Sequence, residues 1–190
     1  MNEPKNIALG MSGASGAPYF LRLLDRLQER EDVALHLIAS EGGRRVLQEE
    51  CGVSWPPPQA NEATTVYQVK NIGARLASGS FKLHSLVVLP CSMHSVAAMA
   101  SGLAANLIHR TAACQLKESR QLIVVPRETP LSLINLRAMT ALKEAGAVIL
   151  PASPGFYHQP RSVEDLVDTV VDRVIDHLGL DDPTIKRWNP

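Results

Sequence analysis

The residues best suited to chemistry in this chain directly follow short apolar segments. Ser12-Gly13-Ala14-Ser15-Gly16 comes after Ile7–Met11. Glycines let a backbone turn tightly and approach an anion, and free N–H groups at the start of the next helix attract phosphate. The turn is equally consistent with a plain strand-to-helix connection in which Ser15 caps the helix. It contains neither G-x-G-x-x-G nor the Walker pattern, so it does not indicate dinucleotide or triphosphate binding.

Arg127 and Glu128 form the most informative pair. They follow the apolar segment Leu122–Val125 and lie between Pro126 and Pro130. Adjacent residues of this kind can present a cation and a carboxylate to one pocket. The alternative is an exposed ion pair, with Thr129 capping the next helix and Pro130 in its first position.

Other apolar segments are followed by residues that could contact a ligand. These are Ser40, the run Cys91-Ser92-Met93-His94, and Phe156-Tyr157 in a loop rich in proline and glycine. A nucleophilic Cys91 would need a base, and no second motif supplies one, so a small buried or ligand-lining thiol is favoured. His94 is a candidate base, although a lone histidine on a turn is more often a helix cap or a hydrogen-bonding group.

The elements that must position these residues alternate along the chain. Strands are expected at Ile7–Met11, Val33–Ala39, Ser85–Leu89, Leu122–Val125 and Ala147–Leu150, and helices from the first turn to about Glu31, at Glu41–Cys51 and from Ser162 to Gly179. Short apolar runs separated by helices predict a parallel sheet covered on both faces. We therefore expect one α/β domain over residues 1–190, a three-layer, doubly wound, Rossmann-like (flavodoxin-like) fold. In such sheets ligands bind outside the carboxyl ends of the strands.

Two helical segments add positive charge. Arg173 borders the apolar stripe of the last helix, and either points inward or pairs with Asp176 at the surface. Arg110 and Lys117 lie two turns apart on roughly one face of another helix.

Composition limits the partners and the compartment. The formal net charge is zero, which removes the broad attraction on which a nucleic-acid binder relies. No secretory signal and no apolar run of membrane-spanning length is visible, so we expect no membrane association. The chain has an odd number of cysteines, and they are widely spaced: Cys51, Cys91 and Cys114. This pattern is typical of reduced cytoplasmic thiols and not of a disulfide frame or a zinc site.

Six ordered blocks resemble one family, the UbiX flavin prenyltransferases. They are Gly13-Ala14-Ser15-Gly16-Ala17, Ser78-Gly79-Ser80-Phe81, Pro90-Cys91-Ser92-Met93, Leu116-Lys117-Glu118, Arg127-Glu128-Thr129-Pro130-Leu131 and Pro154-Gly155-Phe156-Tyr157. The resemblance runs over nearly the whole chain.

The resemblance implies a specific reaction. Family members bind FMN and join a dimethylallyl group from dimethylallyl phosphate to N5 and C6 of the flavin. The product, prenylated FMN, serves decarboxylases of the UbiD type, and the family needs no metal. Members form dodecamers, with sites built at subunit contacts.

The same resemblance implies roles for individual residues. The FMN site would be lined by Gly13, Ala14, Ser15, Ser40, Cys91, Ser92, Met93, His94 and Arg127. Dimethylallyl phosphate would be held by Lys117, Tyr157 and Arg173, assisted by Arg110. Glu128, with Ser15 as a relay near N5, is the candidate for proton handling. Glu50 is a second candidate, matching a family carboxylate that reaches in from a neighbouring subunit. The last helix and the tail, 162–190, including Trp188, are expected in the ligand site or in contacts between subunits, for which the excursion Pro56–Pro58 is also available.

Three positions depart from the family pattern: Pro18, Ala105 and Cys114. They affect the surroundings of Arg110 and leave the proposed ligand contacts intact. Three other functions therefore stay open: an FMN-binding accessory subunit that has lost prenyl transfer, a flavoprotein decarboxylase that acts directly, and an α/β binding module without flavin. The choice between a monophosphate and a diphosphate substrate also stays open.

Overall fold

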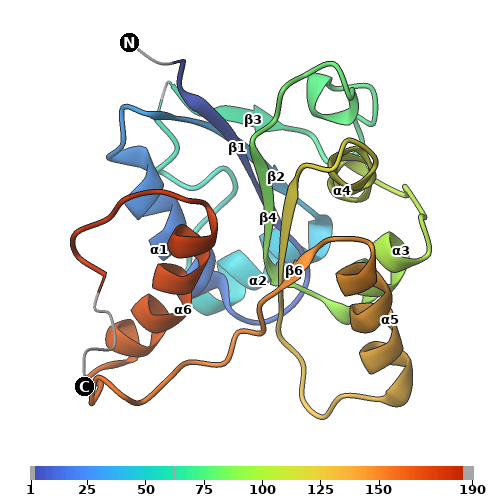
Figure 1. Cartoon of the computed structure of the whole chain (residues 1–190). Coiled ribbons are helices and arrows are strands. Elements are labelled where there is room, and N and C mark those ends of the chain that lie inside the picture. Colours follow the sequence, from blue (N-terminus) through green and yellow to red (C-terminus); the bar gives the residue numbers. More distant parts are fainter. Residues whose placement is uncertain (1–2, 62, 186–190) are drawn as a thin grey trace.

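Six parallel strands form one sheet in the order β3-β2-β1-β4-β5-β6, with helices on both faces (Figure 1). The computed structural model describes residues 3–61 and 63–185. The strands are β1 (Lys5–Met11), β2 (Val33–Ala39), β3 (Thr65–Tyr67), β4 (Ser85–Cys91), β5 (Gln121–Pro126) and β6 (Val148–Ile149). The helices are α1 (Ala17–Gln28), α2 (Glu41–Cys51), α3 (Met93–Ala100), α4 (Leu107–Lys117), α5 (Leu133–Glu144) and α6 (Val163–His177), with a 3-10 turn η1 (Arg75–Ala77).

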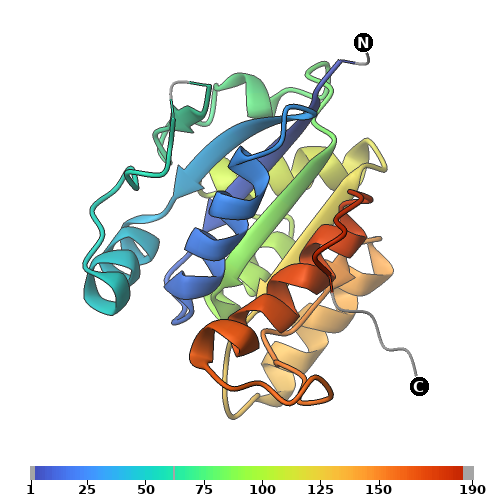
Figure 2. The same cartoon turned by 90° about the vertical axis from the view of Figure 1, so that its left-hand side faces the viewer.

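The sheet separates two apolar cores. Alternate side chains of β1 point to opposite faces, so Ile7 and Leu9 belong to the core under α1, α2 and α6, whereas Ala8 belongs to the core under α3, α4 and α5. Figures 1 and 2 show the helices arranged in these two groups. Every residue of β4 is buried, as expected for a central strand covered on both sides.

The helices follow their sequence patterns. In α1, Phe20, Leu23, Leu24 and Leu27 recur at helical spacing and are buried. The helix α6 begins with a capping box: Ser162 Oγ accepts the N–H of Asp165 at 3.1 Å, and Asp165 Oδ2 accepts the N–H of Ser162 at 3.2 Å. Gly179, with φ of 62°, follows its end in the left-handed region.

The predicted fold is confirmed, with one strand added. The edge strand β3 was not predicted because it has only three residues, two of them exposed. Apart from β3, the strand order is that of a flavodoxin-like sheet. None of the described helices is long and apolar enough to cross a membrane.

Two segments expected to be available for interfaces can be placed only in part. Trp188 lies outside the described residues. Before Pro56, the Trp55 ring packs against Phe20 with centroids 5.9 Å apart, and Arg44 lies 5.9 Å from that ring. Pro57 is buried. Part of this excursion is therefore already packed against the rest of the same chain.

Candidate functional site

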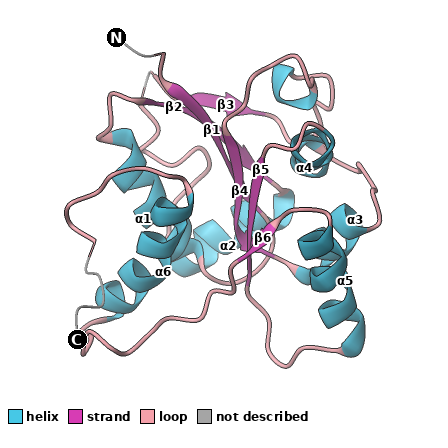
Figure 3. Ribbon diagram, in the orientation of Figure 1, coloured by secondary structure: helices cyan, strands magenta, loops and turns pink. Residues whose placement is uncertain are grey.

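Three helices begin after the carboxyl ends of three neighbouring strands, at the lower end of the strands in Figure 3. They are α1 after β1, α2 after β2 and α3 after β4. Ser40 Oγ accepts the N–H of Gly43 at 3.0 Å, and Ser92 Oγ accepts the N–H of Ser95 at 3.4 Å. A helix cannot satisfy the remaining N–H groups of its first turn internally, so this edge suits an anion such as a phosphate.

Ser12 joins two of these strand ends. Its side chain is 1% exposed, and its Oγ accepts the N–H of Ser92 at 2.7 Å. The Ser12 N–H donates to the Pro90 carbonyl at 3.1 Å. The start of α3 is thereby fixed relative to the turn after β1.

Glycines let the backbones of the first two turns approach each other. A Cβ on Gly13 would lie 3.2 Å from Gly42 Cα, and a Cβ on Gly43 would lie 2.6 Å from the Met11 carbonyl oxygen. A side chain at either position would displace backbone. The edge therefore offers a ligand a backbone surface with few side chains.

The turn after β1 is held between a carboxylate and a guanidinium. Glu50 Oε2 accepts the N–H groups of Gly16 at 2.9 Å and Ala17 at 2.8 Å, while Arg127 Nε donates to the Ser15 carbonyl at 3.1 Å. Partial burial raises the pKa of Glu50, but hydrogen bonds from Ser15, Gly16 and Ala17 and the charge of Arg127 outweigh it, so the pKa is lowered. Glu50 is therefore a carboxylate at neutral pH, at the positive end of α1.

This arrangement changes two expectations. Gly16, and not Ser15, is the N-cap residue of α1, and Glu50 supplies the oxygen that a capping side chain would give. The resemblance implies that Glu50 reaches in from a neighbouring subunit. In the structure its carboxylate contacts the turn of its own chain.

Arg127 and Glu128 line one cavity of about 320 Å³ at the end of β5, together with residues such as Met139 and Ala152. Glu128 Oε1 accepts the N–H of Thr129 at 3.1 Å. The alternative in which Thr129 caps the next helix is wrong, because α5 begins at Leu133 with Ser132 as its cap.

The residues after β4 differ in exposure. Cys91 and Met93 are buried, and His94 is exposed. Burial raises the pKa of the Cys91 thiol to about 12, against a smaller lowering by Ser12. Cys91 is thus a thiol with almost no thiolate at neutral pH, as the favoured interpretation expected.

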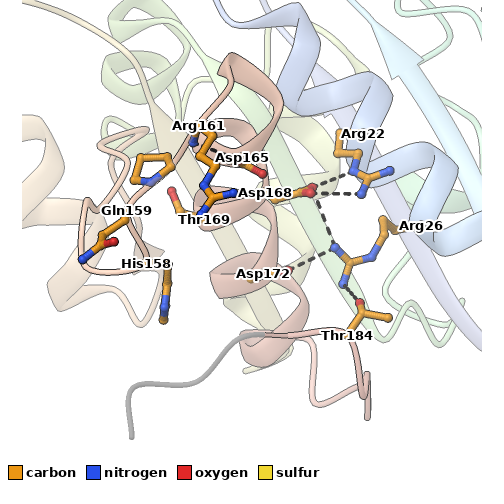
Figure 4. Close-up of a pocket in the computed structure, with 11 residues that line it drawn as sticks. Arg22, Arg26, His158, Gln159, Arg161, Asp165, Asp168, Thr169, Asp172 and Thr184 are labelled. Carbon is orange, nitrogen blue, oxygen red and sulfur yellow. Dashed lines mark hydrogen bonds and ion pairs between the residues drawn. The ribbon is translucent and has the colours of Figure 1, made fainter. Parts of the chain in front are cut away.

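A cavity of about 410 Å³ between α1, α6 and residues 158–161 holds many charged groups (Figure 4). Two of its arginines, Arg22 and Arg26, form ion pairs with aspartates of α6. Arg26 Nη1 lies 3.0 Å from Asp172 Oδ1, and Arg22 Nε lies 2.6 Å from Asp168 Oδ1. Arg26 also binds Asp182 and the Thr184 hydroxyl, which attaches the C-terminal segment to α1. We interpret this cavity as an ion-pair cluster that holds the tail. Within the described ranges, no three His, Cys, Asp or Glu side chains are arranged to hold a metal ion.

Comparison with known proteins identifies the family. The model of the family described as Flavoprotein matches residues 1–175. The flavin prenyltransferase UbiX of Pseudomonas aeruginosa is 46% identical over 201 residues, covering 99% of this chain and 96% of that protein. The chain belongs to the UbiX flavin prenyltransferases.

Solved structures of the family agree with the fold. The dodecameric FMN-dependent UbiX-like decarboxylase from Escherichia coli O157:H7 has a TM-score of 0.92 and 37% identity, covering 97% of this chain and 100% of that one. AnUbiX (PadA1), solved with FMN and dimethylallyl pyrophosphate, has a TM-score of 0.91 and 38% identity, covering 99% of each chain. This member of the UbiX family therefore has the family's whole domain.

One chain brings the predicted FMN-site residues together but not the predicted phosphate-binding cations. Lys117 precedes β5 and Arg127 follows it, so the two lie at opposite ends of a strand about 20 Å long. Arg173 also lies toward the end where β5 begins. It is one turn before His177, and the His177 carbonyl accepts a hydrogen bond from the Gln121 side chain at the start of β5.

The predicted phosphate-binding residues also lie far apart on the surface. Lys117 and Arg173 belong to helices on opposite faces of the sheet. Arg173 Nη1 pairs with Asp176 Oδ2 at 3.0 Å, the surface alternative of the sequence analysis. Arg110 lies exposed in the first turn of α4, about 10 Å along the axis from Lys117. Tyr157 is 77% exposed on the loop after β6.

Sequence reasoning missed three features of the edge. Gly42-Gly43 follows Ser40 after a single residue, and that dipeptide at a helix start was a signal of close backbone approach. Ser12 was seen in the turn but was not assigned to the site. Tyr19 packs against Gly16 near Arg127; burial raises its pKa and Arg127 opposes that rise. Nothing in the sequence indicated this contact.

Proposed function

We propose that this chain is a flavin prenyltransferase that joins a dimethylallyl group from dimethylallyl phosphate to reduced FMN, without a metal. The observation that carries the proposal is the locked turn at the carboxyl edge, with Ser15 between the Glu50 carboxylate and the Arg127 guanidinium. Family membership over the whole chain supplies the reaction class. The product would be prenylated FMN for decarboxylases of the UbiD type.

The edge fits FMN. The first-turn N–H groups of the helices suit its phosphate. Gly13 and Gly42 approach each other closely and carry no side chains, so the flat flavin ring can lie against their backbone. Ser40, the residues Cys91–His94 and Arg127 would complete the site. Reduced FMN supplies the two nucleophilic atoms, N5 and C6, that receive the dimethylallyl group.

The chain's own residues would handle charge and protons. Breaking the allylic C–O bond leaves cationic character on the dimethylallyl group and negative charge on the departing phosphate. Arg110, Lys117 and Arg173, with the Tyr157 hydroxyl, would stabilise the phosphate, because fixed cations favour a developing anion. The Tyr157 ring would stabilise the allyl cation.

Ring closure needs a base for the proton on C6. Glu128, which lines the same cavity as Arg127, is our candidate, with the released phosphate as the other acceptor. Glu50 already accepts two backbone N–H groups. We therefore assign it chiefly to holding Ser15 in place.

We also propose that the protein acts as a homo-oligomer, a dodecamer like its E. coli relative. Lys117 and Arg173 could then reach the FMN site of neighbouring copies. The helix α5 supports this, because Leu131, Leu133, Ile134 and Leu136 around it are 42%, 60%, 74% and 46% exposed. An apolar surface of this kind is usually covered by another chain. The three free cysteines suit a cytoplasmic location.

The test is incubation of the purified protein with reduced FMN and dimethylallyl phosphate, followed by mass spectrometry of the released flavin. We expect a flavin that carries one dimethylallyl group. Bound FMN without any adduct would instead indicate an accessory subunit. Release of carbon dioxide from an aromatic acid by this chain alone would indicate a direct decarboxylase. A protein without affinity for FMN would refute all three flavin functions.

A further inference from the structure

We infer that Gly79 is a positioning residue for Lys117: the missing side chain at residue 79 is what allows the Lys117 ammonium and the Glu118 carboxylate to meet. This inference rests on the proposed function, in which Lys117 binds the phosphate. It assigns a role to the segment Ser78–Phe81, which the functional site at the carboxyl edge leaves unexplained.

The contact at Gly79 is with two charged groups. A Cβ on Gly79 would overlap Glu118 Oε1 and would lie 2.9 Å from Glu118 Cδ and 3.0 Å from Lys117 Nζ. In the space left by the glycine, Lys117 Nζ and Glu118 Oε1 lie 3.1 Å apart. The glycine is not explained by backbone conformation, because Gly79 does not have a positive φ. Alanine could therefore adopt the same backbone.

The turn itself cannot move aside easily, because α4 and the residues after it hold its backbone. Arg120 donates to the Gly79 carbonyl at 2.8 Å and to the Phe81 carbonyl at 2.7 Å. The Cys114 thiol lies 2.9 Å from the Ala77 carbonyl oxygen. Within the turn, the hydroxyls of Ser78 and Ser80 are 2.8 Å apart.

The other side of the turn is also packed. The Phe81 ring meets His36 edge to face, with centroids 5.6 Å apart, and Arg75 lies 4.7 Å from its centre. A side chain at residue 79 would therefore displace the ends of Lys117 and Glu118 and leave the backbone where it is.

The displaced groups are the ammonium that would bind the phosphate and the carboxylate that pairs with it. The side chains of Lys117 and Glu118 are 55% and 34% exposed, so moving them costs little folding free energy. Lysine has a long flexible side chain, and a partner that restrains it reduces the entropy lost when a phosphate binds. Glu118 Oε2 also lies 3.8 Å from Arg120 Nη2, which links the restraint to the residue that holds the turn.

The experiment compares G79A and E118Q with G73A. Gly73 is a matched control, because it also lacks a positive φ and a Cβ there would meet only Asn71 Oδ1 at 3.8 Å. For each variant, KM for dimethylallyl phosphate, kcat for adduct formation, Kd for FMN and the midpoint of thermal unfolding are measured.

In G79A we expect KM to rise roughly tenfold, the scale of one charge-assisted contact, with kcat and the FMN Kd within about twofold. E118Q should raise KM in the same direction without touching the turn, and it keeps the test available if G79A folds poorly. G73A should match the wild type. An unchanged KM in G79A, or a higher FMN Kd together with a lower midpoint, would overturn the inference.

A second measurement does not depend on catalysis. The rate of acetylation of Lys117 by acetic anhydride, read by peptide mass spectrometry in protein without substrates, should rise in G79A and not in G73A. An equal rate in both would refute the positioning role. A wild-type protein that forms no adduct, with Lys117 acetylation changed as expected, would refute the proposed function and leave the positioning role of Gly79 intact.

Discussion

His36 is predicted to make the stability of this protein depend on pH between neutrality and about pH 4. The side chain is 1% exposed on β2, and burial, with the nearby charge of Arg75, lowers its pKa from 6.5 to about 4. Its Nε2 lies 3.0 Å from Asn6 Oδ1 and its Nδ1 lies 3.3 Å from the Tyr67 hydroxyl. Arg75 Nε donates to that hydroxyl at 2.9 Å, so the hydroxyl proton is available to a neutral ring nitrogen.

The sign and size of the effect follow from the two pKa values. A histidine whose pKa is lower in the folded state binds fewer protons there, so its contribution is complete above pH 6.5 and is lost as the pH falls toward about 4. The full loss is about 3 kcal/mol, and about 2 kcal/mol of it falls between about pH 7 and about pH 5.

The assay is urea denaturation at fixed protein concentration, at about pH 7 and at about pH 5, for the wild type and H36Q. The free energy of unfolding should fall by about 2 kcal/mol more in the wild type than in H36Q. H158Q, which changes an exposed histidine, should behave as the wild type does. Equal pH dependence in the wild type and H36Q would refute the assignment of a neutral buried histidine.

The remaining predictions concern the carboxyl edge. E50Q removes the charge that caps α1 and should lower the free energy of unfolding by about 0.5 to 1 kcal/mol in denaturation curves, whereas E49Q on the same helix should not. C91A should form adduct at a rate within about twofold of the wild type, because a thiol with this pKa does not act as a nucleophile; a large loss would contradict that. E128Q should retain FMN, measured by flavin fluorescence, yet form adduct more slowly; unchanged turnover would remove Glu128 from proton handling.

Local patterns in the sequence were sufficient for most of the fold. Continuous apolar runs such as Leu122–Val125 mark buried parallel strands, and Ser162 with Asp165 marks the start of α6. The edge strand β3 could not be recognised, since its backbone pairing with β2 carries almost no apolar signal.

The candidate site was likewise predictable from the sequence only in part. The sequence by itself determined that Gly13, Ser40, Ser92 and Arg127 share one edge, because parallel strands bring their carboxyl ends together. Only the tertiary structure decided that Glu50 caps α1, that Gly79 lies against Lys117, and that Lys117 and Arg173 lie on opposite faces of the sheet. These relations depend on how far each side chain reaches and on helix packing. Residue order along the chain does not encode either of these directly.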